Sequence, residues 1–126
     1  MSAIEDLNLS LSDIQSASSL IYKHLSPTPQ LLWPLLSERC GCEVWTKHEN
    51  HLPTGSFKVR GGIWYIDQLI NSAGEVPGVV AATRGNHGQS VAFSAQKNGI
   101  KAQVVIPFNN SHEKNRAMRG YGAELI

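Results

Sequence analysis

Apolar residues in the N-terminal third of the chain follow helical spacing in one segment. Over residues 10–24 they recur every three or four positions behind a serine, which predicts an amphipathic helix; its apolar positions are Leu11, Ile14, Ala17, Leu20 and Ile21. Pro27 and Pro29 then favour extended chain. Residues 31–41 are typical of a short helix or turn that ends at a glycine, and residues 44–47 of a short strand.

Beyond residue 47 the pattern becomes regular. Apolar residues keep helical spacing in three segments, so helices are expected at residues 56–70, 86–98 and 111–119. Short apolar runs predict three strands, the first two of a kind buried on both faces of a sheet, at residues 78–83, 101–106 and 123–126. Together with the strand at residues 44–47, they alternate with the helices through short connections. This order predicts an α/β fold, a parallel sheet flanked by helices.

The length of the chain limits what it can enclose. It has 126 residues, 41% of them apolar, which is enough for one core but small for an enzyme that surrounds both a cofactor and a substrate. The pattern also stops at residues 124–126, within an apolar strand. We therefore expect the chain to be the front part of a longer protein.

Charge argues against two classes of partner. The formal net charge is +1, so neither nucleic acid nor an anionic membrane is expected as a partner. Glu5 and Asp6 stand where a secretory signal would carry bases, and no apolar run approaches the length of a membrane span. A cytoplasmic protein is expected.

Cysteine and histidine give no metal pattern. Cys40 and Cys42 are the only cysteines and are separated by one residue, which fits neither a disulfide framework nor a zinc motif. The five histidines show no HExxH motif and no paired helical spacing. No metal site is expected.

Two glycine-rich loops lead into predicted helices. One is PTGS at residues 53–56, with Lys58 just after it; the other is TRGNHG at residues 83–88, directly after a predicted strand. In open parallel sheets ligands bind at such junctions, where free backbone N–H groups hold anions. Neither loop fits a nucleotide-phosphate or dinucleotide motif. The loops alone leave Lys58 as a surface charge, a phosphate ligand or a covalent nucleophile.

The loops and their flanks resemble the threonine and serine dehydratases, which are fold type II pyridoxal phosphate enzymes of the tryptophan synthase beta-like superfamily. The resemblance covers residues 27–126 and keeps the family's order and spacing. It is carried by Lys47-x-Glu49, PTGSFKVRG at residues 53–61, GNHGQ at residues 85–89, and the shorter matches TP at 28–29, LS at 36–37 and YGAE at 121–124.

The resemblance implies the N-terminal part of a two-domain enzyme with pyridoxal 5'-phosphate as its cofactor. Residues 1–50 would be a helix and arm belonging to the large domain, and residues 51–126 an incomplete small α/β domain. The family's phosphate-binding loop and the residue that faces the pyridine nitrogen would lie beyond residue 126, so the chain alone is not expected to be active. At full length the resemblance implies a homo-oligomer acting on a small amino acid.

The resemblance also implies roles for individual residues. Lys58 matches the lysine that forms the Schiff base with the cofactor, and Phe57 the aromatic residue that packs near its ring. Asn86 matches the asparagine that hydrogen-bonds the cofactor's 3'-oxygen. The remaining candidates are the loop that receives the substrate carboxylate (Thr83, Gly85, the Asn86 backbone and His87), and Ser56 and Arg84 as possible specificity residues.

The activity implied is elimination of water from a 3-hydroxy amino acid, giving a 2-keto acid and ammonia. Lys58 would take the Cα proton after its release from the cofactor. Cysteine and threonine synthases typically continue KDR after the lysine, whereas this chain has Lys58-Val-Arg-Gly61, which favours the dehydratases.

Arg84 leaves the substrate open. Serine racemases usually carry a serine at its position, which favours elimination over racemisation. An arginine there could pair with a second carboxylate, as in 3-hydroxyaspartate, or could point to solvent. A 3-hydroxyaspartate dehydratase, a serine racemase and a non-catalytic binding or assembly module remain the alternatives.

Overall fold

The computed structural model describes residues 9–126 and begins with an amphipathic helix, α1 (Leu11–Ile21). Ser10 caps it: the Ser10 hydroxyl accepts from the backbone N–H of Asp13, and the Asp13 carboxylate accepts from the backbone N–H of Ser10. This reciprocal pair satisfies two N–H groups that would otherwise lack partners. The predicted helix at residues 10–24 is therefore confirmed, with slightly shorter bounds.

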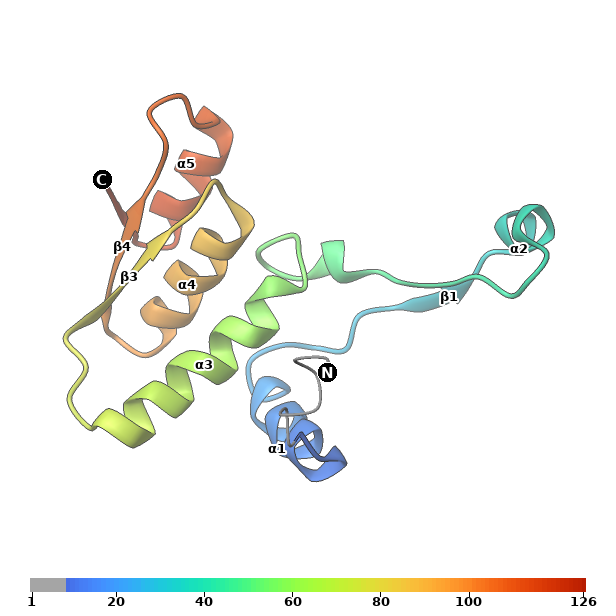
Figure 1. Ribbon diagram of the computed structural model, residues 1–126, viewed down its shortest axis with the longest axis horizontal. Coiled ribbons are helices and arrows are strands. Elements are labelled where there is room, and N and C mark those ends of the chain that lie inside the picture. The colour runs from blue at the N-terminus through green and yellow to red at the C-terminus, as the bar shows by residue number, and fades with distance from the viewer. Residues whose placement is uncertain (1–8) are drawn as a thin grey trace, which may run out of the picture.

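A two-stranded arm follows α1. Strand β1 (Gln30–Leu32) pairs antiparallel with β2 (Trp45–Lys47), and the short helix α2 (Pro34–Cys40) lies between them, ending at Gly41 in the left-handed region with φ 67°. In Figure 1 the arm projects away from the rest of the molecule.

The arm corrects one expectation. The strand at residues 44–47 was expected to open the parallel sheet, but β2 pairs only with β1 among the described residues. The turn at Gly41 sends the chain back along residues 30–32, which offer a local antiparallel partner without the long crossover that parallel pairing requires. Strand β1 was not predicted.

The rest of the chain forms the α/β unit that was predicted. A single 3₁₀ turn, η1 (Glu49–His51), leads into it. Strands β3, β4 and β5 form a parallel sheet in that order, and the elements are α3 (Lys58–Ala73), β3 (Gly78–Ala82), α4 (Asn86–Lys97), β4 (Lys101–Val105), α5 (His112–Gly120) and β5 (Glu124–Leu125). All three predicted helices and the last three predicted strands are confirmed to within three residues at each end. No helix within residues 9–126 is long and apolar enough to cross a membrane.

Two buried clusters hold these elements together. The first joins the sheet to α4 and α5 and consists of Val91, Ala92, Ala95, Ala102, Val104, Met118 and Ala123. The second joins α1 to α3 and α4 and consists of Ile21, Leu25, Leu52, Val59, Ile63 and Phe93. Helix α3 is therefore packed between the N-terminal helix and the α/β unit.

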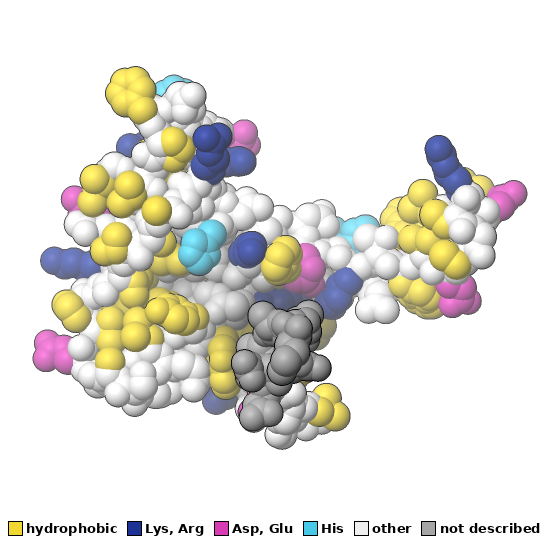
Figure 2. All heavy atoms as spheres, viewed as in Figure 1, with side chains coloured by type: hydrophobic (Ala, Val, Ile, Leu, Met, Phe, Trp, Pro, Cys, Tyr) yellow, Lys and Arg dark blue, Asp and Glu magenta, His cyan; other side chains and the backbone are white. Residues whose placement is uncertain are grey.

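The sheet is covered on one face only within the described residues, which contradicts the expected burial of its strands on both faces. Side chains alternate along β4: Ala102 and Val104 are buried, whereas Val105 is 42% exposed, and in β3 Val80 is 68% exposed. Alternation follows from the pleat, because α4 and α5 pack against one face. Figure 2 shows apolar side chains gathered over the sheet and over the end of the arm.

Candidate active site

A hollow of about 380 Å³ lies where α3, β3 and α4 meet. Its lining is apolar except for Lys58 and His87, and consists of Lys58, Gly61, Gly62, Tyr65, Ile66, Val80, Ala81, Ala82, His87 and Val91. The cation and the imidazole come from the first turns of the two helices. The hollow therefore combines an apolar floor with two groups that can exchange protons.

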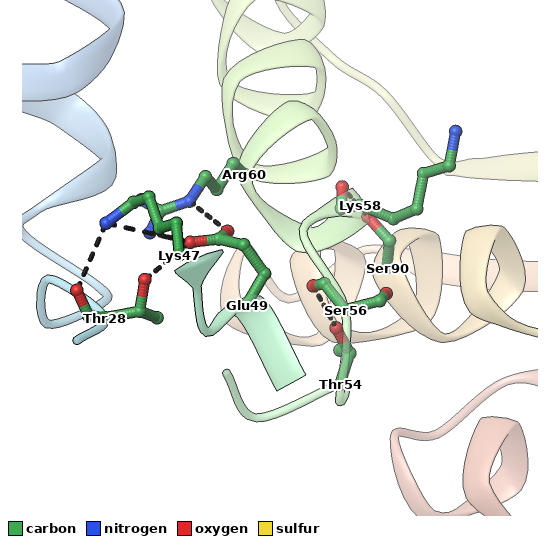
Figure 3. A network of polar contacts seen from close by, with 8 residues as sticks. All are labelled: Thr28, Lys47, Glu49, Thr54, Ser56, Lys58, Arg60 and Ser90. Carbon is green, nitrogen blue, oxygen red and sulfur yellow. Dashed lines mark hydrogen bonds and ion pairs between the residues drawn. The ribbon is translucent and has the colours of Figure 1, made fainter. Parts of the chain in front are cut away.

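Lys58 is the first residue of α3, and its side chain is exposed. Its Nζ lies 5.0 Å from the centre of the Phe57 ring, a cation–π contact. In Figure 3 the Lys58 side chain points away from the acidic residue nearest along the chain, Glu49. Within residues 9–126 no carboxylate pairs with Lys58.

The loop before Lys58 is held by its own backbone. Gly55 has φ 64°, which favours glycine, and its N–H donates to the Leu52 carbonyl over 2.8 Å. The Tyr121 hydroxyl donates to the Pro53 carbonyl, so the loop is tied to the end of α5. The Ser56 hydroxyl is buried and has no hydrogen-bond partner among the described residues.

The loop between β3 and α4 aims backbone donors outward. The Gly85 N–H donates to the Thr83 hydroxyl oxygen over 3.2 Å, and Asn86 and His87 form the first turn of α4 with exposed side chains. The first N–H groups of a helix have no partner within it. A carboxylate or another anion can therefore bind at this turn without a cationic side chain.

Glycine at position 88 brings this turn close to the core. A Cβ there would lie 2.4 Å from the Met118 Sδ and 2.7 Å from the Thr83 Cγ2. Any larger residue would push α4 away from α5 and from the end of β3. Gly88 thus sets how closely the first turn of α4 approaches Thr83.

Helices α3 and α4 pack tightly beside Lys58. A Cβ on Gly62 would lie 2.2 Å from the Ser90 Oγ and 2.9 Å from the Ser94 Oγ, so only glycine fits. At this contact the Ser90 hydroxyl donates to the Lys58 carbonyl over 2.7 Å. Sequence reasoning missed Ser90 and Gly62, although serines four residues apart facing a glycine are a signal of close helix packing.

A cluster of polar residues fixes the opposite side of α3 (Figure 3). Arg60 donates to both carboxylate oxygens of Glu49, from Nε over 2.7 Å and from Nη2 over 3.0 Å. The Thr28 hydroxyl donates to the same carboxylate over 2.6 Å, and Lys47 lies 3.9 Å from it. Glu49 and Arg60 form part of the motif quoted above, but no role was assigned to them.

This cluster shifts the protonation of its members. The hydrogen bond from Arg60 lowers the pKa of Glu49 below its ordinary value, and burial opposes that change. The hydrogen bond to Glu49 raises the pKa of Arg60. Both groups are therefore held in their charged forms.

The structure brings most of the predicted site residues to one edge of the α/β unit. Lys58 and His87 line the hollow, Phe57 lies against Lys58, and the other loop residues, Thr83, Gly85 and Asn86, lie at the start of α4. Two candidates stand apart from the hollow: Arg84 is exposed and Ser56 lies in the preceding loop, and neither lines it.

Comparison with known proteins identifies the family. The sequence model of the family described as "Pyridoxal-phosphate dependent enzyme" matches residues 21–126. The chain belongs to this family. Pyridoxal phosphate is therefore the cofactor that its site residues must be tested against.

Among curated members of the pyridoxal-phosphate dependent enzymes, three similar relatives carry three different activities in their names. A biosynthetic L-threonine dehydratase of Haemophilus influenzae is 39% identical over 113 residues, which is 90% of this chain and 22% of the relative. A serine racemase of Schizosaccharomyces pombe is 37% identical, and an L-threo-3-hydroxyaspartate ammonia-lyase of Saccharomyces cerevisiae is 34% identical; each match covers 90% of this chain and 35% of the relative.

Solved structures confirm the fold class. A pyridoxal 5'-phosphate-dependent aspartate racemase matches with a TM-score of 0.88 and 34% identity, covering 94% of this chain and 37% of its own. A bacterial-type threonine deaminase matches with a TM-score of 0.80 and 38% identity, covering 94% and 36%. These family members share the fold type II architecture that was expected. The chain thus spans between about a fifth and a third of the length of the relatives it matches.

The described residues fit part of a pyridoxal phosphate site. The cofactor's aldehyde needs an amine that no carboxylate holds, and among the described residues Lys58 offers one at the rim of an apolar hollow. The buried Ser56 hydroxyl lacks a partner in the loop just before Lys58, and free N–H groups lie at the start of α4. These are the features that a bound polar ring and an anionic substrate would use.

Proposed function

We propose that the protein to which this chain belongs is a pyridoxal phosphate-dependent dehydratase. It removes water from threonine, serine or a related 3-hydroxy amino acid, giving a 2-keto acid and ammonia. The observation that carries the proposal is that a lysine without a carboxylate partner in the described part of the chain meets the first turn of α4 at one apolar hollow. The Val-Arg-Gly sequence after Lys58 and the threonine dehydratase relatives support elimination within this family.

Lys58 has two tasks in this proposal. Its Nζ would hold the cofactor covalently, and after its release the same amine would take the Cα proton of the substrate. When bound, pyridoxal phosphate supplies an electron sink for the charge left at Cα. The Asn86 amide, in the first turn of α4, would hydrogen-bond the cofactor's 3'-oxygen, and Phe57 would cover one side of the lysine.

The loop between β3 and α4 would orient the substrate. The Thr83 oxygen accepts from the Gly85 N–H, so the hydroxyl hydrogen of Thr83 remains free to donate to a carboxylate. The N–H groups of Asn86 and His87 would bind the same carboxylate at the start of α4. A fixed carboxylate keeps the Cα proton within reach of Lys58.

The arm fits a role in a larger assembly. Its exposed apolar side chains would be covered by a large domain, and they include Leu31, Leu32, Trp33, Leu35, Leu36 and Trp45. We therefore assign residues 1–50 to the large domain and residues 51–126 to the small domain. The assembled enzyme would be a cytoplasmic homo-oligomer acting on a small amino acid.

A dicarboxylate substrate is the second candidate, and Arg84 is the observation that favours it. Its guanidinium is exposed at the end of β3, one residue before the start of the helix that would bind the substrate. A hydroxyaspartate substrate would place its second carboxylate near that charge. Comparing turnover of threonine and 3-hydroxyaspartate by wild type and Arg84→Ala decides, since equal losses on both substrates would remove this candidate.

Turnover by the whole protein tests the main proposal. We expect 2-keto acid and ammonia to appear in equal amounts from threonine or serine, only in the presence of pyridoxal phosphate. Lys58→Arg keeps the positive charge but removes the amine, so it should abolish product formation. Formation of the D-amino acid without keto acid would instead identify a racemase and contradict the proposal.

A further inference from the structure

The start of α3 lacks a side-chain cap of its own. Phe57 occupies the capping position and makes no side-chain hydrogen bond there, although helix starts are usually held by a serine, threonine, aspartate or asparagine. Lys58 follows directly as the first helical residue. The local sequence therefore does little to fix the backbone of the residue on which the proposed chemistry depends.

Another helix supplies the missing anchor. The Ser90 hydroxyl on α4 donates to the Lys58 carbonyl over 2.7 Å, and Ser90 is 1% exposed. In an α-helix that carbonyl also accepts from the N–H four residues on, so the Ser90 bond is additional to the helix's own. Serine inside a helix often bonds back to its own backbone, whereas here its hydroxyl reaches the neighbouring helix.

The bond depends on the contact at Gly62. With no side chain at this position, α3 approaches the Ser90 hydroxyl closely enough for the bond to form; a Cβ would lie 2.2 Å from the Ser90 Oγ. Lys58 and Gly62 are one helical turn apart and face α4 together. The two helices are thus locked at the level of Lys58.

The same anchor reaches the proposed cofactor ligand on α4. Ser90 lies one turn after Asn86, on the same side of the helix. One hydrogen bond therefore ties the Lys58 backbone to the helix that presents Asn86 and His87. The amine and the polar groups it must face then keep a fixed relative position.

We propose that Ser90 is a positioning residue that fixes Lys58 against the first turn of α4, and so sets where the Lys58 amine meets the cofactor aldehyde. This inference rests on the proposed function. Ser90 is remote from the reacting atoms, because its hydroxyl contacts a backbone carbonyl. Its loss loosens alignment, on which catalytic sites depend to within about 0.5 Å.

The chain offers a matched control. Ser94 lies one turn further along α4, is 0% exposed and also faces Gly62, since its Oγ lies 2.9 Å from where a Cβ on that glycine would be. Its hydroxyl is buried without a partner among the described residues. Ser94→Ala therefore removes the same kind of buried hydroxyl without removing a bond to Lys58.

The test compares Ser90→Ala, Ser90→Cys and Ser94→Ala with wild type in the whole protein. Three quantities are measured: the dissociation constant of pyridoxal phosphate, the rate of borohydride-stable labelling of Lys58, and the pH dependence of the visible absorption of the lysine-bound cofactor. Thermal unfolding of each variant without cofactor is followed in parallel, so that a general loss of stability is recognised.

We expect Ser90→Ala to weaken cofactor binding and slow labelling about fivefold, and to shift the pH profile. Ser90→Cys, a weaker donor of similar size, should give an intermediate effect and serves if the alanine variant does not fold. Ser94→Ala should match wild type. Equal effects of the Ser90 and Ser94 changes on all three quantities would overturn the inference, whereas absence of label on wild-type Lys58 would overturn the proposed function itself.

Discussion

Lys58 and Arg60 are two cations in the first turn of α3, and their surroundings differ completely. Arg60 reaches toward the arm and donates twice to Glu49, which also accepts from Thr28. Lys58 faces the hollow, where within residues 9–126 only the Phe57 ring lies against its amine. One cation is fully engaged in holding the molecule together, and the other is kept available.

This difference separates a structural role from a chemical one. An amine that forms a covalent bond cannot also be held by a carboxylate, since the ion pair would have to break first. A guanidinium cannot serve as a base but forms two parallel bonds to a carboxylate. The sequence places each residue type on the side of α3 where its chemistry is useful.

The largest expected effect comes from Lys58→Ala. We expect turnover to fall about 10³-fold or more, because no other described amine lines the hollow. The free energy of unfolding should change little, since the Lys58 side chain is exposed. Steady-state turnover together with urea unfolding checks both parts; a strong loss of stability would mean that Lys58 is a structural cation like Arg60.

A smaller effect is expected on the side of α3 that faces α4. Gly62→Ala places a Cβ 2.2 Å from the Ser90 Oγ, so unfolding free energy should fall by about 1–3 kcal/mol. Gly61→Ala is the matched control, because a Cβ there meets nothing within 4 Å. It should stabilise the helix by about 0.5–1 kcal/mol. Urea unfolding of both variants measures the contrast, and similar results for the two would show that α3 and α4 are not closely packed.

On the Arg60 side, Glu49→Gln removes the charge from a part-buried cluster. We expect a loss of about 1–3 kcal/mol in unfolding free energy, since hydrogen bonds to charged groups are the stronger ones. Turnover at saturating cofactor should change much less than for Lys58→Ala. If Glu49→Gln instead abolished turnover while leaving stability intact, the division of roles between the two cations would be wrong.

The contribution of Glu49 should depend on pH in one direction. Its pKa is lower in the folded state than in the unfolded chain, so its stabilisation is fully present above the unfolded pKa and is lost as pH falls through the lowered one. The stability difference between wild type and Glu49→Gln should therefore shrink on acidification below the ordinary glutamate pKa. Urea unfolding over a series of acid buffers measures it; a difference that grew toward low pH would contradict the assigned shift.

The smallest effect is expected from Lys47→Ala. Lys47 lies 3.9 Å from the Glu49 carboxylate and its side chain is 42% exposed, so the ion pair is solvated. Such pairs contribute about 0–1 kcal/mol. The variant serves as the control for Glu49→Gln under identical conditions, and a loss equal to that of Glu49→Gln would show that total charge matters rather than the bidentate bond.

Much of the α/β unit could be predicted because its signals are local. Apolar periodicity and the glycines after helices located α3, α4 and α5, and short apolar runs located β3 and β4. The position of Lys58 beside the start of α4 also follows from a general property of open α/β sheets, whose loops meet at one edge.

The arm and the helix contact could not be predicted from such signals. Residues 30–32 carry three residues of no distinctive alternation, and their strand exists only because residues 45–47 return beside them. The exposure of Val80 reflects which elements cover the sheet, which no local pattern records. Ser90 and Gly62 lie on different helices, far apart in the sequence, so their contact is visible only in the fold.

The assignment of Lys58 as the residue that binds the cofactor is the central claim, and borohydride reduction tests it most directly. The whole protein loaded with pyridoxal phosphate is reduced and digested, and the labelled peptides are mapped. The account predicts one cofactor label, on Lys58 in the peptide that contains TGSFK, and none in Lys58→Arg. A label on another lysine, or an equal label in the variant, would contradict it.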